Sequence, residues 1–569
     1  MVQQGTSATG KTHDNAGVVE VGGLRLPFLA PARPRRLGEA EYLFGPGDLT
    51  LLHPFGDTRF YRHGWNSWSP SGWRQLTDEP LRIYDSPERL LTADDARNDT
   101  PAAHSGSAVG ALAAPDGRTL LLGALGLGAP RVGATTTTLW GTVEAMPGPM
   151  ELHLDVRRGR EAGTRGGDAE QGHEVLRPRA PVTPRPGLDR RPSPGHDGVR
   201  ADAGWYLALG DEETVFRRYA GLLAERFGHG RNRAGRVWCS WYSYYEDISE
   251  ELLASLTPQI ASFPFDVIQV DDGWEKAVGD WEANDKFPSG MTGLARLITG
   301  AGLKAGLWIA PLIALPRSAF VREHPEWLIQ SPSGGPLVAG YNWGGPYYAL
   351  DTTRPEVQDH LRALFTRLTG DGFSYFKLDF LYAGALEGLR CADVHREQAY
   401  RDALTLIRQA VGPDTYLLGC GAPILPSAGL FDGMRVGPDV GAFWDNGARP
   451  RDPSGVGAKN SLVAALHRRW LSPLYETDPD VVYFRRRRSL LDDAQRQVVR
   501  DLATVLGFKS TSDPISWLDP GEQEELRTWL ERDETVLQTG RFSYQVGDRV
   551  VDLGLFLDGY HPPASTTVP

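Results

Sequence analysis

The chain is poor in cysteine and has no long apolar run. Its 569 residues contain three cysteines, which are too few and too widely spaced for a disulfide framework or a zinc pattern. No segment reaches the length of a membrane-spanning helix, and the polar start MVQQGTSATGKTHDNAG lacks the apolar stretch of a secretory signal. We therefore expect a cytoplasmic protein without a membrane partner.

Positive charge is also in deficit. The chain has 60 Lys and Arg against 72 Asp and Glu, a formal net charge of −12, which disfavours a nucleic-acid partner. Hydrophobic residues make up 41%, enough for a large core, and the length predicts more than one domain. The 16 tryptophans fit either core packing or the binding of flat apolar faces such as those of sugars, and composition does not decide between them.

The N-terminal part predicts a β-sandwich. Between about 17 and 211, runs such as GRTLLLGALGLG and TTTTLWGTVEAM are strand-like and are interrupted by Gly, Pro and Asp. Residues 157–204 are rich in Pro, Arg and Gly with few large apolar side chains, so we expect a disordered insertion or a long surface loop there. Residues 1–16 are expected to be disordered as well, and the acidic start and final glycine of DEETVFRRYAGLLAERFG predict a linking helix within 212–234.

Strand and helix patterns alternate from 235 to 520, which predicts a parallel (β/α)8 barrel of the TIM type. A doubly wound open sheet is the alternative. The candidate strands are 236–244, 265–272, 304–312, 374–380, 415–423 and 433–440, with weaker candidates at 478–484 and 507–513. Residues 521–569 predict a short C-terminal β segment, with a hairpin turn at Gly547 and Asp548.

Charged and aromatic residues gather where these strands end, which is the face of a barrel that carries function. Each buried charge costs several kcal/mol unless it is paired, so repeating that cost on several strands indicates a site rather than isolated ion pairs. The candidates in chain order are Trp241, Tyr242, Asp271, Asp272, Trp308, Lys377, Asp379, Cys420, Arg435 and Asp439.

The stretch YFKLDF places a lysine and an aspartate on one face of an apolar strand. Because side chains alternate along a strand, Lys377 and Asp379 both point inward, and the ammonium favours the ionised carboxylate that a nucleophile needs. Asp439 follows Pro438 at the end of a different strand. Two carboxylates, one anionic and one protonated, are the apparatus of glycoside hydrolysis.

Several motifs together resemble glycoside hydrolase family 36, and most closely its compact bacterial α-galactosidases, the melibiases. They are WCSWYSYYEDIS, PFDVIQVDDGWEKAVGDW, KFPSGM, GLWIAPL, YFKLDFLYAGAL, LLGCGAPILPSAGLFDGMRVGPDV and a later DPD. HGWNSWSPSGW resembles the tryptophan-bearing loop with which that family's β domain caps the active site.

The resemblance implies a role for each matching residue. Asp379 matches the nucleophile and Asp439 the general acid/base, while Trp241 and Tyr242 match first-strand residues near the sugar and Trp65 the capping loop. The galactose-binding positions are matched by Asp271, Asp272, Trp308, Lys377, Cys420 and Arg435. It implies no metal and no organic cofactor.

The resemblance further implies a retaining exo-α-galactosidase that acts on melibiose- or raffinose-type oligosaccharides. The alternatives are a galactosyl-transferring enzyme like the raffinose synthases, an α-N-acetylgalactosaminidase and a non-catalytic carbohydrate-binding protein. Two positions depart from the family pattern, since Thr477 precedes Asp-Pro-Asp and His63 precedes Gly64 where the family usually has Asn. A C-terminal β-sandwich is usual in the family, and we expect the segment 521–569 to be a reduced or incomplete form of it. The sequence does not indicate an oligomeric state.

Overall fold

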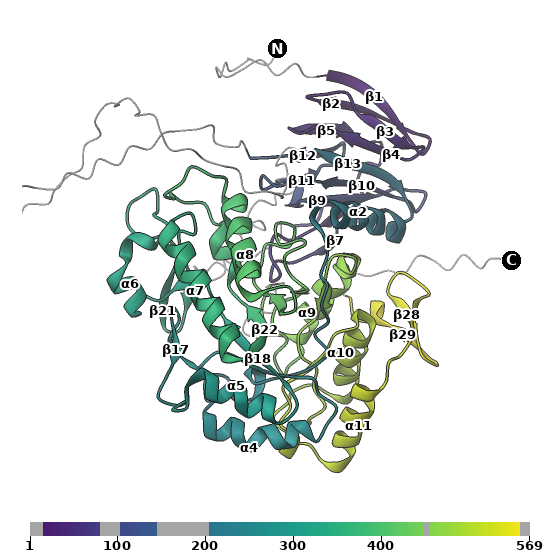
Figure 1. Ribbon diagram of the computed structural model, residues 1–569. Helices are drawn as coiled ribbons and strands as arrows, with labels where there is room; N and C mark the ends of the chain where they lie inside the picture. Colours follow the sequence, from purple (N-terminus) through teal and green to yellow (C-terminus); the bar gives the residue numbers. More distant parts are fainter. Residues whose placement is uncertain (1–14, 80–102, 145–203, 448–453, 558–569) are drawn as a thin grey trace, which may run out of the picture.

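The protein has two antiparallel sheets near its N-terminus and a curled parallel sheet after them (Figure 1). The computed structural model describes residues 15–79, 103–144, 204–447 and 454–557. Most of the predicted 157–204 insertion and most of the 1–16 segment lie outside these residues. Among the described residues, no helix has both the length and the apolar character needed to cross a bilayer.

The two antiparallel sheets share one hydrophobic core. Leu51 and Leu139 of the first sheet belong to the same buried cluster as Leu122 and Leu207 of the second. The first sheet has the strand order β1 (Asn15–Val21), β2 (Leu24–Ala30), β5 (Leu49–Leu52), β12 (Thr138–Thr142), β11 (Arg131–Ala134), β8 (His104–Ser107). The second has the order β3 (Arg35–Gly38), β4 (Glu41–Phe44), β13 (Trp205–Gly210), β10 (Thr119–Ala124), β9 (Val109–Ala113), β6 (Arg59–Arg62), β7 (Gly72–Gln75).

The parallel sheet has eight strands, and each falls within or beside one of the predicted strands. In chain order they are β14 (Arg236–Cys239), β15 (Val267–Val270), β18 (Lys304–Ile309), β22 (Phe373–Leu378), β23 (Tyr416–Gly419), β24 (Gly433–Arg435), β25 (Glu476–Asp478) and β26 (Lys509–Thr511). Each pairs in parallel with the next, from β14 to β25, and β26 pairs with β14. A parallel bridge between Val482, just after β25, and Thr511 of β26 brings the two ends of the sheet together.

Most of the helices lie outside this sheet (Figure 1). The linking helix α2 (Glu212–Phe227), which Asp211 caps by accepting from the Thr214 backbone N–H, instead packs against β10 and β13 of the second antiparallel sheet. The others are α3 (Trp241–Tyr244), α4 (Glu250–Ala261), α5 (Gly290–Gly300), α6 (Ala319–Glu323), α7 (Pro355–Asp371), α8 (Arg396–Val411), α9 (Ala458–His467), α10 (Asp493–Leu506) and α11 (Pro520–Glu531).

Smaller sheets complete the described part of the chain. The hairpin β16 (Glu275–Ala277) and β17 (Asp280–Ala283) follows β15, and a sheet of β19 (Ile313–Ala314), β21 (Gly345–Ala349) and β20 (Val338–Asn342) follows β18. At the C-terminus β27 (Val536–Gln538), β28 (Ser543–Val546) and β29 (Arg549–Asp552) form a three-stranded sheet. The predicted turn at Gly547 and Asp548 joins β28 to β29.

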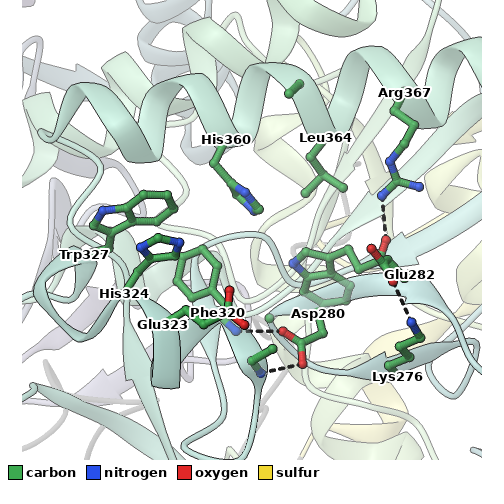
Figure 2. Close-up of a pocket in the computed structure, with 14 residues that line it drawn as sticks. Lys276, Asp280, Glu282, Phe320, Glu323, His324, Trp327, His360, Leu364 and Arg367 are labelled. Atoms are coloured by element: carbon green, nitrogen blue, oxygen red, sulfur yellow. Dashed lines mark hydrogen bonds and ion pairs between the residues drawn. The ribbon is translucent and has the colours of Figure 1, made fainter.

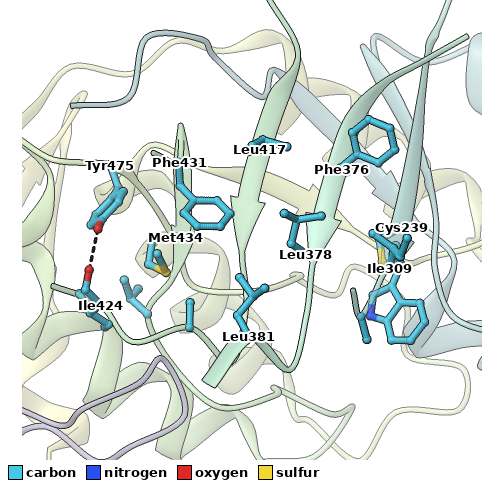
Figure 3. Close-up of a cluster of buried hydrophobic side chains, with 14 of the residues drawn as sticks. Cys239, Ile309, Phe376, Leu378, Leu381, Leu417, Ile424, Phe431, Met434 and Tyr475 are labelled. Carbon is cyan, nitrogen blue, oxygen red and sulfur yellow. Dashed lines mark hydrogen bonds between the residues drawn. The ribbon is translucent and has the colours of Figure 1, made fainter. Parts of the chain in front are cut away.

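Side chains of the parallel strands alternate between two environments, as the sequence predicts. Phe376 and Leu378 of β22 belong to the large buried cluster, together with Leu417 of β23 and Met434 of β24 (Figure 3). Tyr375 instead stacks on Tyr416, with ring centroids 4.9 Å apart, in a separate small cluster. Lys377 shares the parity of Tyr375, so it lies on that inner side.

Two local predictions were wrong. Residues 241–244 form helix α3 instead of extending the first strand, because Ser240 already has helical backbone angles and the chain turns there. Residues 520–531 form α11, where a β segment was expected. Asp519 and Glu522 form a capping box around Pro520 at its start, so the helix signal was present in the sequence.

One buried arginine joins the loop between β6 and β7, residues 63–71, to the parallel sheet. We call this segment the docking loop. Arg468, with no exposed surface, donates to the backbone carbonyls of Gly64, Asn66, Ser67 and Ser69 at 2.7–3.2 Å, and also to that of Val436. The loop backbone also pairs with the segment after β23, through Ser67 N–H to the Ala422 carbonyl at 3.1 Å.

Replacing Arg468 by Met is expected to destabilise the protein strongly, because buried carbonyls would lose their donor and each unmet hydrogen bond costs about 1–3 kcal/mol. We expect the free energy of unfolding to fall by about 3 kcal/mol or more in urea denaturation. The matched control is Arg469→Met, since Arg469 is less buried and donates to Gln538 in the C-terminal sheet. Equal losses in the two variants would contradict the role given to Arg468.

Candidate active site

Lys377 lies between two buried carboxylates from different strands. Its ammonium nitrogen is 3.0 Å from Asp271 Oδ2, just after β15, and 3.8 Å from Asp379 Oδ2, just after β22. Burial alone would lower the pKa of Lys377, but Asp271 and Asp379 raise it well above its usual range. The lysine is therefore a fixed cation, and it is closer to Asp271 than to the predicted nucleophile.

Asp379 has both carboxylate oxygens in fixed positions. Trp308 Nε1 donates to its Oδ2 at 3.0 Å, and the Phe380 backbone N–H donates to its Oδ1 at 2.8 Å. Phe380 takes a left-handed φ of 52°, which turns the chain sharply after the carboxylate. The register of β18 with β22 places Trp308 opposite Lys377, and this explains why the indole reaches Asp379.

Asp271 and Asp272 point to different partners although they are adjacent. Asp271 Oδ2 accepts from Gln269 Nε2 at 2.5 Å and lies 3.6 Å from Cys239 Sγ. Asp272 accepts from Trp343 Nε1 at 2.8 Å, in the turn between β20 and β21. Burial, and then the neighbouring Glu275, raise the pKa of Asp272 to about 9.

Arg435 forms a second charged centre at the end of β24. Its Nη2 donates to Asp439 Oδ1 at 2.8 Å and to Asp480 Oδ2 at 2.9 Å. The Tyr242 hydroxyl also donates to Asp480, and Cys420 Sγ lies 3.8 Å from Arg435 Nη1. Burial alone would raise the pKa of Asp439, but Arg435 and Lys377 hold it below its usual range.

The two remaining predicted tryptophans, Trp241 and Trp65, pack against other side chains. Trp241 packs edge-on against Tyr245 at 5.2 Å. Trp65 is buried under the Arg396 guanidinium, which lies 5.7 Å from its ring. Trp68 is the docking-loop side chain that packs against Phe380, with ring centroids 5.2 Å apart. A Cβ on Gly421, whose φ is 54°, would come within 2.7 Å of the Trp68 ring, so glycine is required after Cys420.

Four residues of this region were not singled out from the sequence: Trp68, Trp343, Asp478 and Asp480. Trp68 and Trp343 lie in loops, which strand-end reasoning does not reach. Asp478 and Asp480 are the acids of the DPD motif, which was noted without a role. The predicted strand 478–484 placed both acids at its start, whereas the observed strand β25 ends at Asp478 and puts them at the same edge as Asp271 and Asp272.

A separate cavity of about 490 Å³ lies between the β16–β17 hairpin and helices α6 and α7 (Figure 2). His324 and Trp327 stack at its wall with ring centroids 3.8 Å apart. Asp280 accepts from the backbone N–H groups at the start of α6, and Arg367 donates to the Trp281 carbonyl. None of the predicted site residues lines this cavity. Across the described residues, no group of three or more His, Cys, Asp or Glu side chains is placed to hold a metal ion.

Comparison with known proteins identifies the family. The family model described as Melibiase matches residues 217–408. The α-galactosidase TtGalA from Thermus thermophilus is 37% identical to this chain, and its structure superposes with a TM-score of 0.80. The superposition covers 95% of this chain and 100% of TtGalA. The chain belongs to glycoside hydrolase family 36.

More distant relatives of the same family share less. The α-galactosidase AgaA of Geobacillus stearothermophilus is 30% identical over 214 residues, which is 35% of this chain and 28% of AgaA. The chain thus matches less than a third of the length of this curated relative. The crystal structure of AgaA, a family 36 α-galactosidase, has a TM-score of 0.54 at 15% identity over 89% of this chain, which shows a shared fold.

Both departures from the family 36 pattern lie in buried positions. The His63 ring lies 3.1 Å from the Ser107 carbonyl through Nδ1, and burial lowers its pKa to about 3. Thr477 is buried in β25, and its hydroxyl has no hydrogen-bond partner within the described part of the chain. Neither change removes a carboxylate from the two charged centres.

Asp478 predicts a pH dependence of stability. Burial raises its pKa to about 7, although Arg435 lowers it. An unfolded aspartate titrates near pH ~3.9, so the folded protein binds more protons between these values and its free energy of unfolding falls as pH rises. In urea denaturation, the free energy of unfolding of the wild type should fall by about 3–4 kcal/mol between pH ~4 and pH ~7, relative to that of Asp478→Asn. A difference that does not change with pH would contradict this assignment.

Proposed function

We propose that this family 36 member is a retaining exo-α-galactosidase that removes terminal α-D-galactosyl residues from melibiose- or raffinose-type oligosaccharides. We further infer that the parallel sheet is a closed (β/α)8 barrel preceded by a β-sandwich. The observation that carries the function is the pair of strand-end carboxylates, Asp379 and Asp439, each held by its own buried cation. Two related complexes add support, because the structures of TtGalA include one with p-nitrophenyl α-D-galactopyranoside and one with stachyose.

In the first step, Asp379 attacks the anomeric carbon while Asp439 protonates the departing glycosidic oxygen. Hydrogen bonds from Trp308 and Phe380 leave Asp379 without a free rotation, so its lone pair is aimed before the sugar binds. In the second step Asp439 removes a proton from water, which attacks the galactosyl-enzyme from the side that the leaving group vacated. Two inversions retain the α configuration.

Specificity for galactose is assigned to the acids after β15. Galactose differs from glucose by its axial O4, and buried polar groups placed to hydrogen-bond one hydroxyl reject a sugar that lacks it there. Asp271 is fixed by Lys377 and Asp272 by Trp343, so both acids have defined orientations. Trp308 and Trp343, with ring centroids 6.4 Å apart, offer aromatic surface for the C–H face of the ring.

A screen of aryl α-glycosides tests this function directly. We expect turnover of the α-galactoside and little or none of the α-glucoside or the α-N-acetylgalactosaminide. Faster turnover of the N-acetylgalactosaminide would favour that alternative specificity. Transfer of galactose to an added sugar acceptor would favour a galactosyl-transferring enzyme. Binding of the α-galactoside without turnover would favour a non-catalytic carbohydrate-binding protein.

Asp379→Gly should remove the covalent route and open a space below the anomeric carbon. Hydrolysis of an aryl α-galactoside is expected to fall by several orders of magnitude. Azide in that space should attack by a single inversion and give the β-galactosyl azide, identified by NMR. Formation of the α-azide would mean that Asp379 is not the nucleophile.

Asp439→Ala should depend on the leaving group. Activated aryl galactosides leave without a proton and should still form the galactosyl-enzyme, whereas melibiose should be nearly inert. Azide should then release the intermediate as the α-azide through two inversions. Equal losses with both kinds of substrate would contradict an acid/base role for Asp439.

A further inference from the structure

Asp480 contacts the side chain that binds the Asp439 carboxylate and the backbone N–H that follows Asp439. Its Oδ2 accepts from Arg435 Nη2 at 2.9 Å, from the Tyr242 hydroxyl and from the Val440 backbone N–H at 3.0 Å. Arg435 Nη2 also donates to Asp439, and Val440 is the next residue after Asp439. The positions of the Asp439 side chain, which is the proposed acid, and of the Asp439 backbone therefore both depend on the buried Asp480 carboxylate.

The backbone of Asp480 is strained. Its φ is 84°, in the left-handed region that residues other than glycine seldom occupy. Such a conformation costs on the order of 1–3 kcal/mol and persists where the surroundings impose it, often at functional sites. Asp480 N–H donates to Asp478 Oδ1 at 2.7 Å, which fixes this turn after Pro479.

Negative charge exceeds positive charge around Asp480. The titratable groups that face it are Cys239 from β14, Tyr242 from α3, Lys377 from β22, Arg435 from β24, Asp439 after β24, Asp478 from β25 and Tyr483 beyond it. Lys377 is already shared with Asp271 and Asp379. Ionising Asp439, Asp478 and Asp480 together would leave buried charge unbalanced, so protons are retained among them.

We propose that Asp480 is a positioning residue: through Arg435, Tyr242 and the Val440 N–H it places Asp439, and it holds with Asp439 the single proton that the first step needs. This inference rests on the proposed α-galactosidase function. In the first step the proton leaves the Asp439–Asp480 pair for the glycosidic oxygen, and both carboxylates become anionic beside Arg435. In the second step the attacking water returns a proton to the pair.

The arrangement resolves a conflict in the site. A general acid must carry a proton near the working pH, yet Arg435 favours the anionic form of Asp439. Burial raises the pKa of Asp480, although Arg435 lowers it, so this second carboxylate keeps a proton on the pair where Asp439 alone would lose it.

Asp480→Asn is the first test, because asparagine has a similar shape but cannot share the proton. With melibiose, we expect kcat/KM to fall about 100-fold or more, and with an activated aryl galactoside less than about 10-fold. The basic limb of the kcat/KM–pH profile should move to lower pH, since Asp439 beside Arg435 then loses its proton earlier. If kcat/KM falls equally with both substrates and the basic limb of the pH profile does not move, the role of Asp480 is merely structural and the proposal is overturned.

Asp432→Asn is the matched control. Asp432 is also buried, also paired with an arginine, Arg408 at 2.7 Å, and also accepts from backbone N–H groups, but it precedes β24 at the opposite strand end. Its substitution should lower thermal stability and leave the leaving-group dependence and the pH profile unchanged. A moved limb in this control as well would overturn the assignment to Asp480.

Tyr242→Phe keeps the proposal testable if Asp480→Asn does not fold. Removing the hydroxyl takes a donor away from the anionic form of the pair, so the basic limb should move to higher pH, opposite to the shift in Asp480→Asn. An unmoved limb in this variant would overturn the proposal.

An infrared pH titration separates this inference from the proposed function, because it needs no turnover. The difference spectrum between free wild-type protein and Asp480→Asn should show one carboxylic acid C=O band, in which the bands of other protonated acids such as Asp272 and Asp478 cancel. If the band is present and no α-galactoside is hydrolysed, the proposed function fails and the shared proton stands. Identical titrations of wild type and variant would overturn the shared proton.

Discussion

The site depends on one buried ion cluster, in which Lys377 holds Asp271 and Asp379 together. Neither carboxylate could be buried at its strand end without a cation, because the cost of desolvation is several kcal/mol for each charge. One ammonium within 4 Å of both joins the end of β15 to the end of β22 across β18. The backbone register of β18 with β22 brings Trp308 opposite Lys377 and its indole onto Asp379, so strand pairing and the ion cluster together orient the proposed nucleophile.

Two buried arginines hold other parts of the structure together, as Lys377 holds Asp271 and Asp379. Arg435 holds the acids after β24 and β25, as Lys377 holds those after β15 and β22. Arg468 acts on the backbone instead, because it binds the carbonyls of the docking loop. Through that loop, an antiparallel domain with its own core supplies Trp68 to the wall beside Phe380 and Gly421. The position of the N-terminal domain is thus part of the site's construction.

The sequence was informative where a residue follows a strand and less so elsewhere. Alternation placed Lys377 and Asp379 on one side of β22, and the strand-end rule brought Asp271, Trp308 and Arg435 to the same edge. It could not identify Trp343 or Trp68, because their positions depend on how separate loops fold back onto that edge. Residues 241–244, three of which are aromatic, were predicted as strand, and the helical backbone of Ser240 instead begins a helix there. The start of α11 was readable from its capping box, which the prediction of a β segment did not take into account.

For Asp439 to act as an acid, the Arg435 guanidinium beside it must also be paired with a second carboxylate, Asp480. A guanidinium alone beside a carboxylate favours an ion pair, which suits a base and opposes an acid. A buried second carboxylate on the same nitrogen changes this balance, because one guanidinium cannot offset the ionisation of two carboxylates that share its site. Donors from Tyr242 and Val440 keep that second acid in place despite its strained backbone. The two charged centres therefore differ in their contacts. Asp379 accepts hydrogen bonds from Trp308 and the Phe380 N–H, whereas Asp439 shares the Arg435 guanidinium with Asp480.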